Sequence, residues 1–78
     1  MYDQDVLKKI IELFYTISEA EEISAESELI EDLDLSSMDV MFLISSLEEE
    51  FHISVPEKEI RKMVTVGDVV QIIQDLRK

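Results

Sequence analysis

The sequence predicts an all-α fold, a small bundle of four helices with a long loop between the first two. The chain has 78 residues, which is enough for a single domain spanning residues 1–78. Apolar residues make up 46% of it, which is enough to build a core. In three stretches these residues recur at intervals of three and four, the spacing of one helix face, and a short third helix fits before the last stretch.

The first helix is predicted near the start of the chain. Asp3 and Asp5 lie where its first turn would be, and the helix dipole favours acids there. The apolar face comprises Val6, Leu7, Ile10, Leu13, Phe14 and Ile17. Over residues 18–34 this spacing fails and small polar and acidic residues dominate, which predicts a long loop. We expect the loop to be pinned to the core by Ile23, Leu29, Ile30 and Leu33.

The second helix is predicted from Ser37 to about Phe51. Ser36 can cap it, and Asp39 three residues later completes a variant of the capping box. Its apolar positions include Met38, Met41, Phe42, Ile44, Leu47 and Phe51.

In the second half of the chain, the sequence pattern predicts a short helix followed by a longer one. Pro56 can open a brief helix over residues 57–62. The last helix should begin after Thr65, with Asp68 as the partner in a second capping box, and Gly67 costs little in its first turn. Its apolar positions are Val66, Val69, Val70, Ile73 and Leu76. The apolar faces have to meet one another, so the elements should form a bundle.

The charge of the chain limits which classes of molecule can bind it. Nineteen acidic residues stand against seven basic ones, and the net charge is -12. From Ile10 through Glu57 no residue is cationic, whereas fourteen are carboxylates. Such a surface repels phosphate, so nucleic acid and anionic membranes are disfavoured as partners. A protein with a basic patch is the expected partner.

Several classes of protein are disfavoured by what the sequence contains. There is no cysteine, which excludes disulfides and zinc–thiolate sites. The N-terminal residues are acidic where a signal peptide would be basic, and the longest apolar run, residues 40–44, is too short to span a bilayer. We therefore expect a soluble, cytoplasmic protein. We also expect it to be a monomer.

Catalytic and metal sites are also disfavoured. The one histidine, His52, would lie roughly 20 Å from Ser37 along the second helix, so the two cannot form a nucleophile–base pair. Residues 32–36 offer oxygen ligands at alternate positions. In a calcium loop, however, Ser37 would stand where glycine is required and Leu43 where glutamate is required. We predict no catalytic residue and no metal site, and therefore no enzyme.

Ser37 is placed differently from the other serines, at the first turn of a helix that follows an acidic loop. Unpaired backbone N–H groups and the positive end of the dipole make such a position suitable for an attached phosphate. Serine is also a common helix cap, and position alone favours the cap. Both interpretations stay open at this point.

Two runs of sequence resemble the acyl carrier protein family: EDLDLSSMD at residues 31–39 and LEEEF at residues 47–51. The similarity extends over nearly the whole chain, through ISVP at residues 53–56 and MVTVGDVV at residues 63–70. The resemblance implies that Ser37 receives 4′-phosphopantetheine from coenzyme A through a separate phosphopantetheinyl transferase. The arm would then hold acyl intermediates of fatty-acid or related biosynthesis as thioesters.

The resemblance also implies how partner enzymes recognise the chain. Carriers of this family meet acyl-processing enzymes with basic docking patches through acids on the second helix, and rim charges of this kind raise association rates. The residues at the corresponding places are Met38, Asp39, Phe42, Glu48, Glu49 and Glu50.

The sequence departs from the family pattern at five positions. Ser36 replaces the usual acid before the modified serine, although it can still cap the helix. Elsewhere Met38 replaces leucine, Phe42 replaces a glutamate, Ser45 replaces a methionine and His52 replaces a glycine. These departures hint at a specialised pathway, so a peptidyl, aminoacyl or polyketide carrier is one alternative. The other is an unmodified acidic interaction domain.

Overall fold

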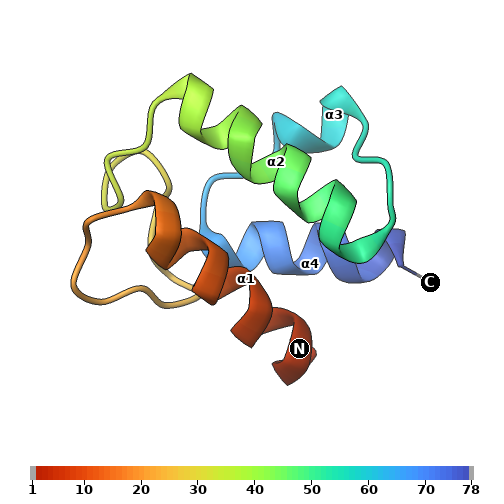
Figure 1. The fold of residues 1–78 in the computed structure, drawn as a ribbon, viewed down its shortest axis with the longest axis horizontal. Helices are drawn as coiled ribbons and strands as arrows, with labels where there is room; N and C mark the ends of the chain where they lie inside the picture. Colours follow the sequence, from red (N-terminus) through yellow and green to blue (C-terminus); the bar gives the residue numbers. More distant parts are fainter. Residues whose placement is uncertain (1, 78) are drawn as a thin grey trace.

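The computed structural model describes residues 2–77, and they form four helices. These are α1 (Gln4–Ile17), α2 (Ser37–Phe51), α3 (Glu57–Ile60) and α4 (Val66–Leu76). α1 packs against both α2 and α4, and α2 crosses over α4 with the short α3 at its side (Figure 1). The predicted all-α bundle and its long first loop are confirmed.

Side-chain caps fix where the long helices begin. The Asp3 carboxylate accepts hydrogen bonds from the first backbone N–H groups of α1. Ser36 and Asp39 form a reciprocal capping box at the start of α2, and Thr65 and Asp68 form one at the start of α4. Both boxes were predicted from the sequence, and both supply partners for backbone groups that a helix end leaves unpaired.

One apolar core lies between the helices and the long loop. Each long helix contributes one face, and the loop contributes buried apolar side chains such as Ile23, Leu29 and Leu33. The largest side chains that are essentially inaccessible to water are Phe14, Ile10, Leu29, Leu43, Leu47, Ile73, Val6, Val66, Val69 and Val70. The faces predicted for α1 and α4 are therefore buried where the sequence indicated.

Three details differ from the sequence prediction. Ile30 does not pin the loop, because 58% of it is exposed; Leu35, which the pattern did not single out, is buried instead. α3 ends at Ile60, two residues early, and a turn follows. On α2, Leu43 joins the core, whereas Met38, Met41 and Phe42 face outward.

Backbone hydrogen bonds tie the long loop to the connection between α3 and α4. The Leu29 N–H donates to the Val64 carbonyl oxygen, and the Val66 N–H donates to that of Ser27, each at 2.9 Å. Within the loop, the Leu35 N–H donates to the Leu29 carbonyl oxygen at 3.1 Å. Because Leu35 directly precedes the cap of α2, these bonds hold the start of that helix in place. Across residues 2–77, no helix is long and apolar enough to cross a membrane.

Candidate functional site

The start of α2 presents two adjacent serines with different surroundings. The Ser36 hydroxyl accepts a hydrogen bond from the Asp39 N–H at 3.2 Å, and the Asp39 carboxylate accepts one from the Ser36 N–H at 2.9 Å. Ser36 is therefore the helix cap. The cap interpretation that position alone favoured for Ser37 is thus wrong, because the neighbouring serine fills that role.

Ser37 is left free by this arrangement. Its side chain is exposed, and its hydroxyl makes no hydrogen bond to any residue in the described part of the chain. The backbone N–H groups of Ser37 and Met38 likewise have no acceptor among residues 2–77. An exposed hydroxyl beside two unpaired N–H groups at a helix start fits an attached phosphodiester, since both the N–H groups and the dipole favour a negative charge.

The surroundings of Ser37 also bear on how a phosphate could be held there. Asp32 and Asp34, in the loop just before α2, are exposed and repel a free anion. His52 caps the opposite end of the helix. A phosphate group at this position would therefore be retained by a covalent bond. Among residues 2–77 no group of three potential ligands could hold a metal ion.

The three glutamates at the end of α2 are not equivalent. The Glu48 carboxylate is half-buried and accepts a hydrogen bond from the Val55 N–H at 2.8 Å. Glu50 pairs with Lys9 of α1, with 2.8 Å between the carboxylate oxygen and Nζ. The hydrogen bond and charge of Glu50 raise the pKa of Lys9 above its usual 10.5. Glu49 is exposed and has no such partner within the described residues.

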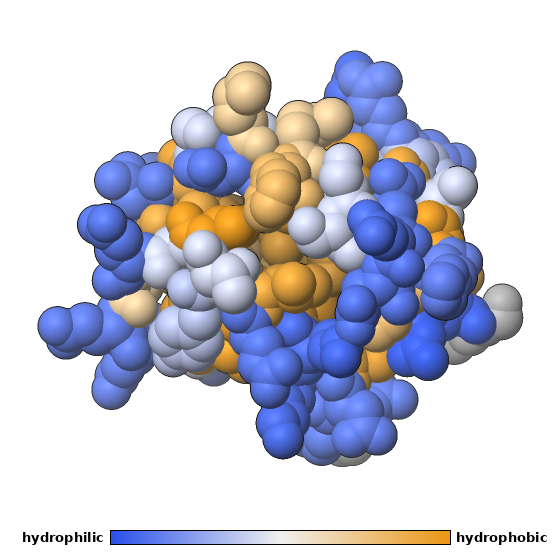
Figure 2. Space-filling view, in the orientation of Figure 1, coloured by the Kyte–Doolittle hydropathy of each residue, from blue (hydrophilic) through white to orange (hydrophobic). Residues whose placement is uncertain are grey.

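The outer face of α2 carries unusually large apolar side chains. Met38 is 80% exposed, Phe42 is 61% exposed and Met41 is 57% exposed. Figure 2 shows apolar colour gathered over the first half of α2, with hydrophilic colour around it. Met41 belongs to this face although the sequence analysis did not select it as a recognition residue. The helical period could have found it, since Met41 lies one turn from Met38 and opposite the buried Leu43.

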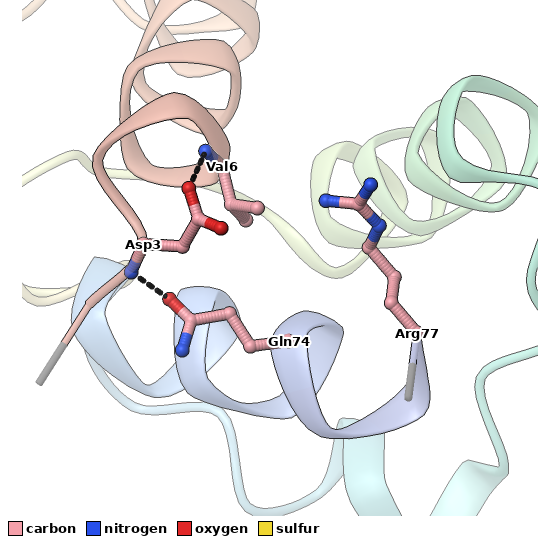
Figure 3. Close-up of a pocket in the computed structure, with 4 residues that line it drawn as sticks. All are labelled: Asp3, Val6, Gln74 and Arg77. Carbon is pink, nitrogen blue, oxygen red and sulfur yellow. Dashed lines mark hydrogen bonds between the residues drawn. The ribbon is translucent and has the colours of Figure 1, made fainter.

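Two of the open hollows on the surface lie between helices. One, of about 390 Å³, lies between α2 and α3 and is lined by Met41, Ile44, Ser45, Glu48, Val55, Glu57, Ile60 and Arg61. The other, of about 330 Å³, lies between the start of α1 and the end of α4 (Figure 3). In the second, the Gln74 side chain accepts a hydrogen bond from the Asp3 N–H, while Arg77 stacks over the Phe51 ring at 5.2 Å. These contacts join α1, α2 and α4, which indicates a structural role for that hollow.

Four helices around one core, with a free serine hydroxyl at the start of the second, are the features of an acyl carrier domain. The family model for the phosphopantetheine attachment site matches residues 4–73. The chain belongs to this family and is an acyl carrier that bears 4′-phosphopantetheine. Proteins of this kind interact with acyl-processing enzymes.

Relatives and solved structures agree with this assignment. An acyl carrier protein of Wolinella succinogenes is 48% identical over 54 residues, covering 69% of this chain and 71% of that protein. One from Helicobacter pylori is 44% identical over 57 residues, covering 73% of each. A putative acyl carrier protein from Mycobacterium tuberculosis superposes with a TM-score of 0.84 at 28% identity, covering 90% of this chain and 96% of that one. One from Thermotoga maritima gives a TM-score of 0.76 at 28% identity, covering 91% and 89%.

Proposed function

We propose that Ser37 is the residue that carries the 4′-phosphopantetheine arm. The observation that supports it is the free, exposed hydroxyl at the start of α2, beside a serine that is already used as the cap. The chain has no cysteine, and the arm supplies the thiol on which a carrier holds acyl groups as thioesters. The capping box of Ser36 and Asp39 fixes where α2 begins, and so it places Ser37 in the first turn of the helix.

The loading step requires a separate phosphopantetheinyl transferase. The Ser37 hydroxyl oxygen forms the new bond to the phosphorus that bears the pantetheine, the P–O bond of the pyrophosphate link in coenzyme A breaks, and the adenosine nucleotide leaves with the bridging oxygen. The transferase accepts the hydroxyl proton, since His52 of this chain lies at the other end of α2. By the same argument we infer that this chain carries intermediates and catalyses no step itself.

The cargo that we propose is an acyl intermediate of fatty-acid or related biosynthesis. The exposed Phe42, at a position where the family pattern has glutamate, favours a peptidyl, aminoacyl or polyketide carrier as the second candidate. Partner enzymes with basic patches are proposed to meet the acids of α2, namely Asp39, Glu48, Glu49 and Glu50. A cytoplasmic location and a monomeric state stay predictions.

Intact-mass measurement on variants tests the assignment of Ser37. Ser37→Ala should remain folded, because alanine is a good helix former and the cap is untouched; we expect stability to change by less than ~1 kcal/mol. After incubation with coenzyme A, magnesium and the transferase, the parent should gain one phosphopantetheine and Ser37→Ala none. Ser45→Ala is the matched control, since it removes another exposed hydroxyl from the same helix.

Circular dichroism on each variant separates loss of the attachment atom from loss of the fold. Modification of a folded Ser37→Ala protein would assign the arm to another residue. A parent that gains no mass would favour an unmodified acidic interaction domain.

A further inference from the structure

The sulfur atoms of this sequence all belong to methionines. There are four methionines and no cysteine. Within residues 2–77, Met63 is half-buried and packs against the core, whereas Met38 is 80% exposed and Met41 is 57% exposed. Methionine is among the residue types that are most often fully buried, so two exposed methionines in the first turns of one helix call for an explanation.

Both exposed methionines lie next to the hydroxyl proposed to carry the arm. Met38 follows Ser37 directly in the chain. Met41 comes four residues after Ser37 in α2, and side chains at this spacing are neighbours on a helix surface, with Cβ atoms about 5–6 Å apart. An enzyme that acts on the Ser37 hydroxyl therefore has to cover one or both thioether groups, whichever surface it uses for its other contacts.

Exposed thioethers are open to a specific and reversible reaction. Hydrogen peroxide delivers one oxygen atom to the sulfur: the O–O bond breaks, the S=O bond forms, and water leaves. The sulfur is oxidised and the peroxide is reduced, and the product, methionine sulfoxide, is polar and chiral. Methionine sulfoxide reductases reverse the change, removing the oxygen as water with electrons from a dithiol.

Oxidation of the exposed pair should leave the fold intact. Neither Met38 nor Met41 belongs to the core or packs against it, and the capping box at the start of α2 contains no sulfur. A sulfoxide at Met63, in contrast, would bring a polar group against core side chains, which is unfavourable without a hydrogen-bond partner. The pair can therefore change the polarity of the surface beside Ser37 while the helices stay in place.

We propose that Met38 and Met41 form a reversible oxidation site that controls the loading of Ser37. As thioethers the two side chains are apolar, and an enzyme that covers them gains by removing them from water. As sulfoxides each carries an oxygen acceptor, and covering that oxygen without supplying a donor is unfavourable. Peroxide thus slows attachment of the arm, and a reductase restores it. The inference rests on the function proposed above, because it concerns the rate at which Ser37 is modified.

Peroxide treatment of the full chain before loading tests whether these two positions are the reactive ones. Dilute hydrogen peroxide is applied and then removed with catalase, and peptide mass mapping follows each sulfoxide with time. Met38 and Met41 should be oxidised at least about threefold faster than Met63, because they are more accessible to the oxidant. Circular dichroism should show unchanged helicity. Oxidation of Met63 at the same rate as the pair would remove the selectivity that the proposal requires.

Loading rates measure the consequence for function. Oxidised and untreated samples are incubated with coenzyme A, magnesium and the transferase, and each oxidised rate is divided by the untreated rate of the same variant. Oxidation should lower kcat/KM of the parent at least about fivefold, and sulfoxide reductase should restore it. Met38→Leu/Met41→Leu should lose less than about twofold, because leucine is similar in volume and has no sulfur. Met63→Leu is the matched control: it keeps the exposed pair and should lose as much as the parent.

The remaining outcomes separate this inference from the function on which it rests. If the untreated parent gains one arm and the oxidised parent loads at the same rate, the attachment site stands and the oxidation site falls. Equal losses on oxidation for the parent and Met38→Leu/Met41→Leu would also overturn the proposal. A parent that takes up no arm before oxidation removes the role of Ser37, and this inference with it.

Discussion

His52 ends α2 with φ at 56°, in the left-handed region that favours glycine. The backbone has to turn there because the Ile53 N–H donates to the Glu48 carbonyl oxygen at 3.1 Å, closing the last turn of the helix. A side chain with a Cβ atom is strained in this conformation, at a cost of roughly 1–2 kcal/mol. The sequence analysis predicted that the second helix ends at about Phe51 and that His52 replaces a glycine of the family pattern, and the structure adds the strained geometry.

Replacing this residue should stabilise the protein. We expect His52→Gly to raise the free energy of unfolding by about 1 kcal/mol, because glycine adopts positive φ without a steric penalty. Urea denaturation followed by circular dichroism measures the change. His52→Ala keeps the Cβ atom and serves as the control. A glycine variant that is no more stable than the alanine variant would show that the left-handed geometry costs His52 little.

Gly67 shows a constraint at residue scale that the sequence could not reveal. A Cβ atom there would collide with the Tyr2 hydroxyl and lie 3.0 Å from the Ala25 carbonyl oxygen. Both neighbours come from parts of the chain more than forty residues away, so no local pattern records them. The sequence predicted only that a glycine would be tolerated in the first turn of α4, whereas packing explains why it has to be small.

At the scale of the helices, the sequence predicted the features that depend on residues close together along the chain. The capping boxes of Ser36 and Thr65 and the apolar faces of α1 and α4 depend on residues within a few positions of one another, and they were predicted correctly. The contacts of Glu48 with Val55 and of Glu50 with Lys9 depend on how elements meet in space. For that reason the cap of α2 could be predicted from the sequence, whereas the different surroundings of the three glutamates could not; Ser37 itself was singled out by the family resemblance, and its role stays a proposal.

The cap of α2 provides a test at this scale. Ser36→Ala removes the hydroxyl that accepts the Asp39 N–H, and we expect it to cost ~0.5–2 kcal/mol of stability. The attachment atom of Ser37 is untouched, so the variant should still gain one arm when it is incubated with transferase. Thermal unfolding and intact mass measure the two effects on the same sample. A variant that is as stable as the parent would show that the Ser36 cap contributes little to the fold.

At the scale of the whole molecule, a strong charge imbalance is held in a small volume. The Cα radius of gyration is 11.2 Å, close to the ~11.5 Å expected of a folded chain of this length. Within residues 2–77 three ion pairs link side chains, and all three involve exposed groups, which stabilise little. The apolar core therefore has to hold together a surface whose charges mostly repel one another.

Added salt should stabilise this fold. The Debye length is about 30 Å at 0.01 M salt, similar to the longest dimension of 31 Å, so carboxylates across the molecule repel one another there. At about 0.1 M it falls to about 10 Å and only neighbouring charges interact strongly. If this screening removes about 1 kcal/mol of repulsion, the melting temperature should rise by roughly 4–8 °C.

Magnesium or calcium should act at lower concentrations than sodium, because divalent ions screen more strongly. Thermal melts by circular dichroism across a salt series measure the effect, and a melting temperature that is indifferent to ionic strength would show that repulsion costs the fold little.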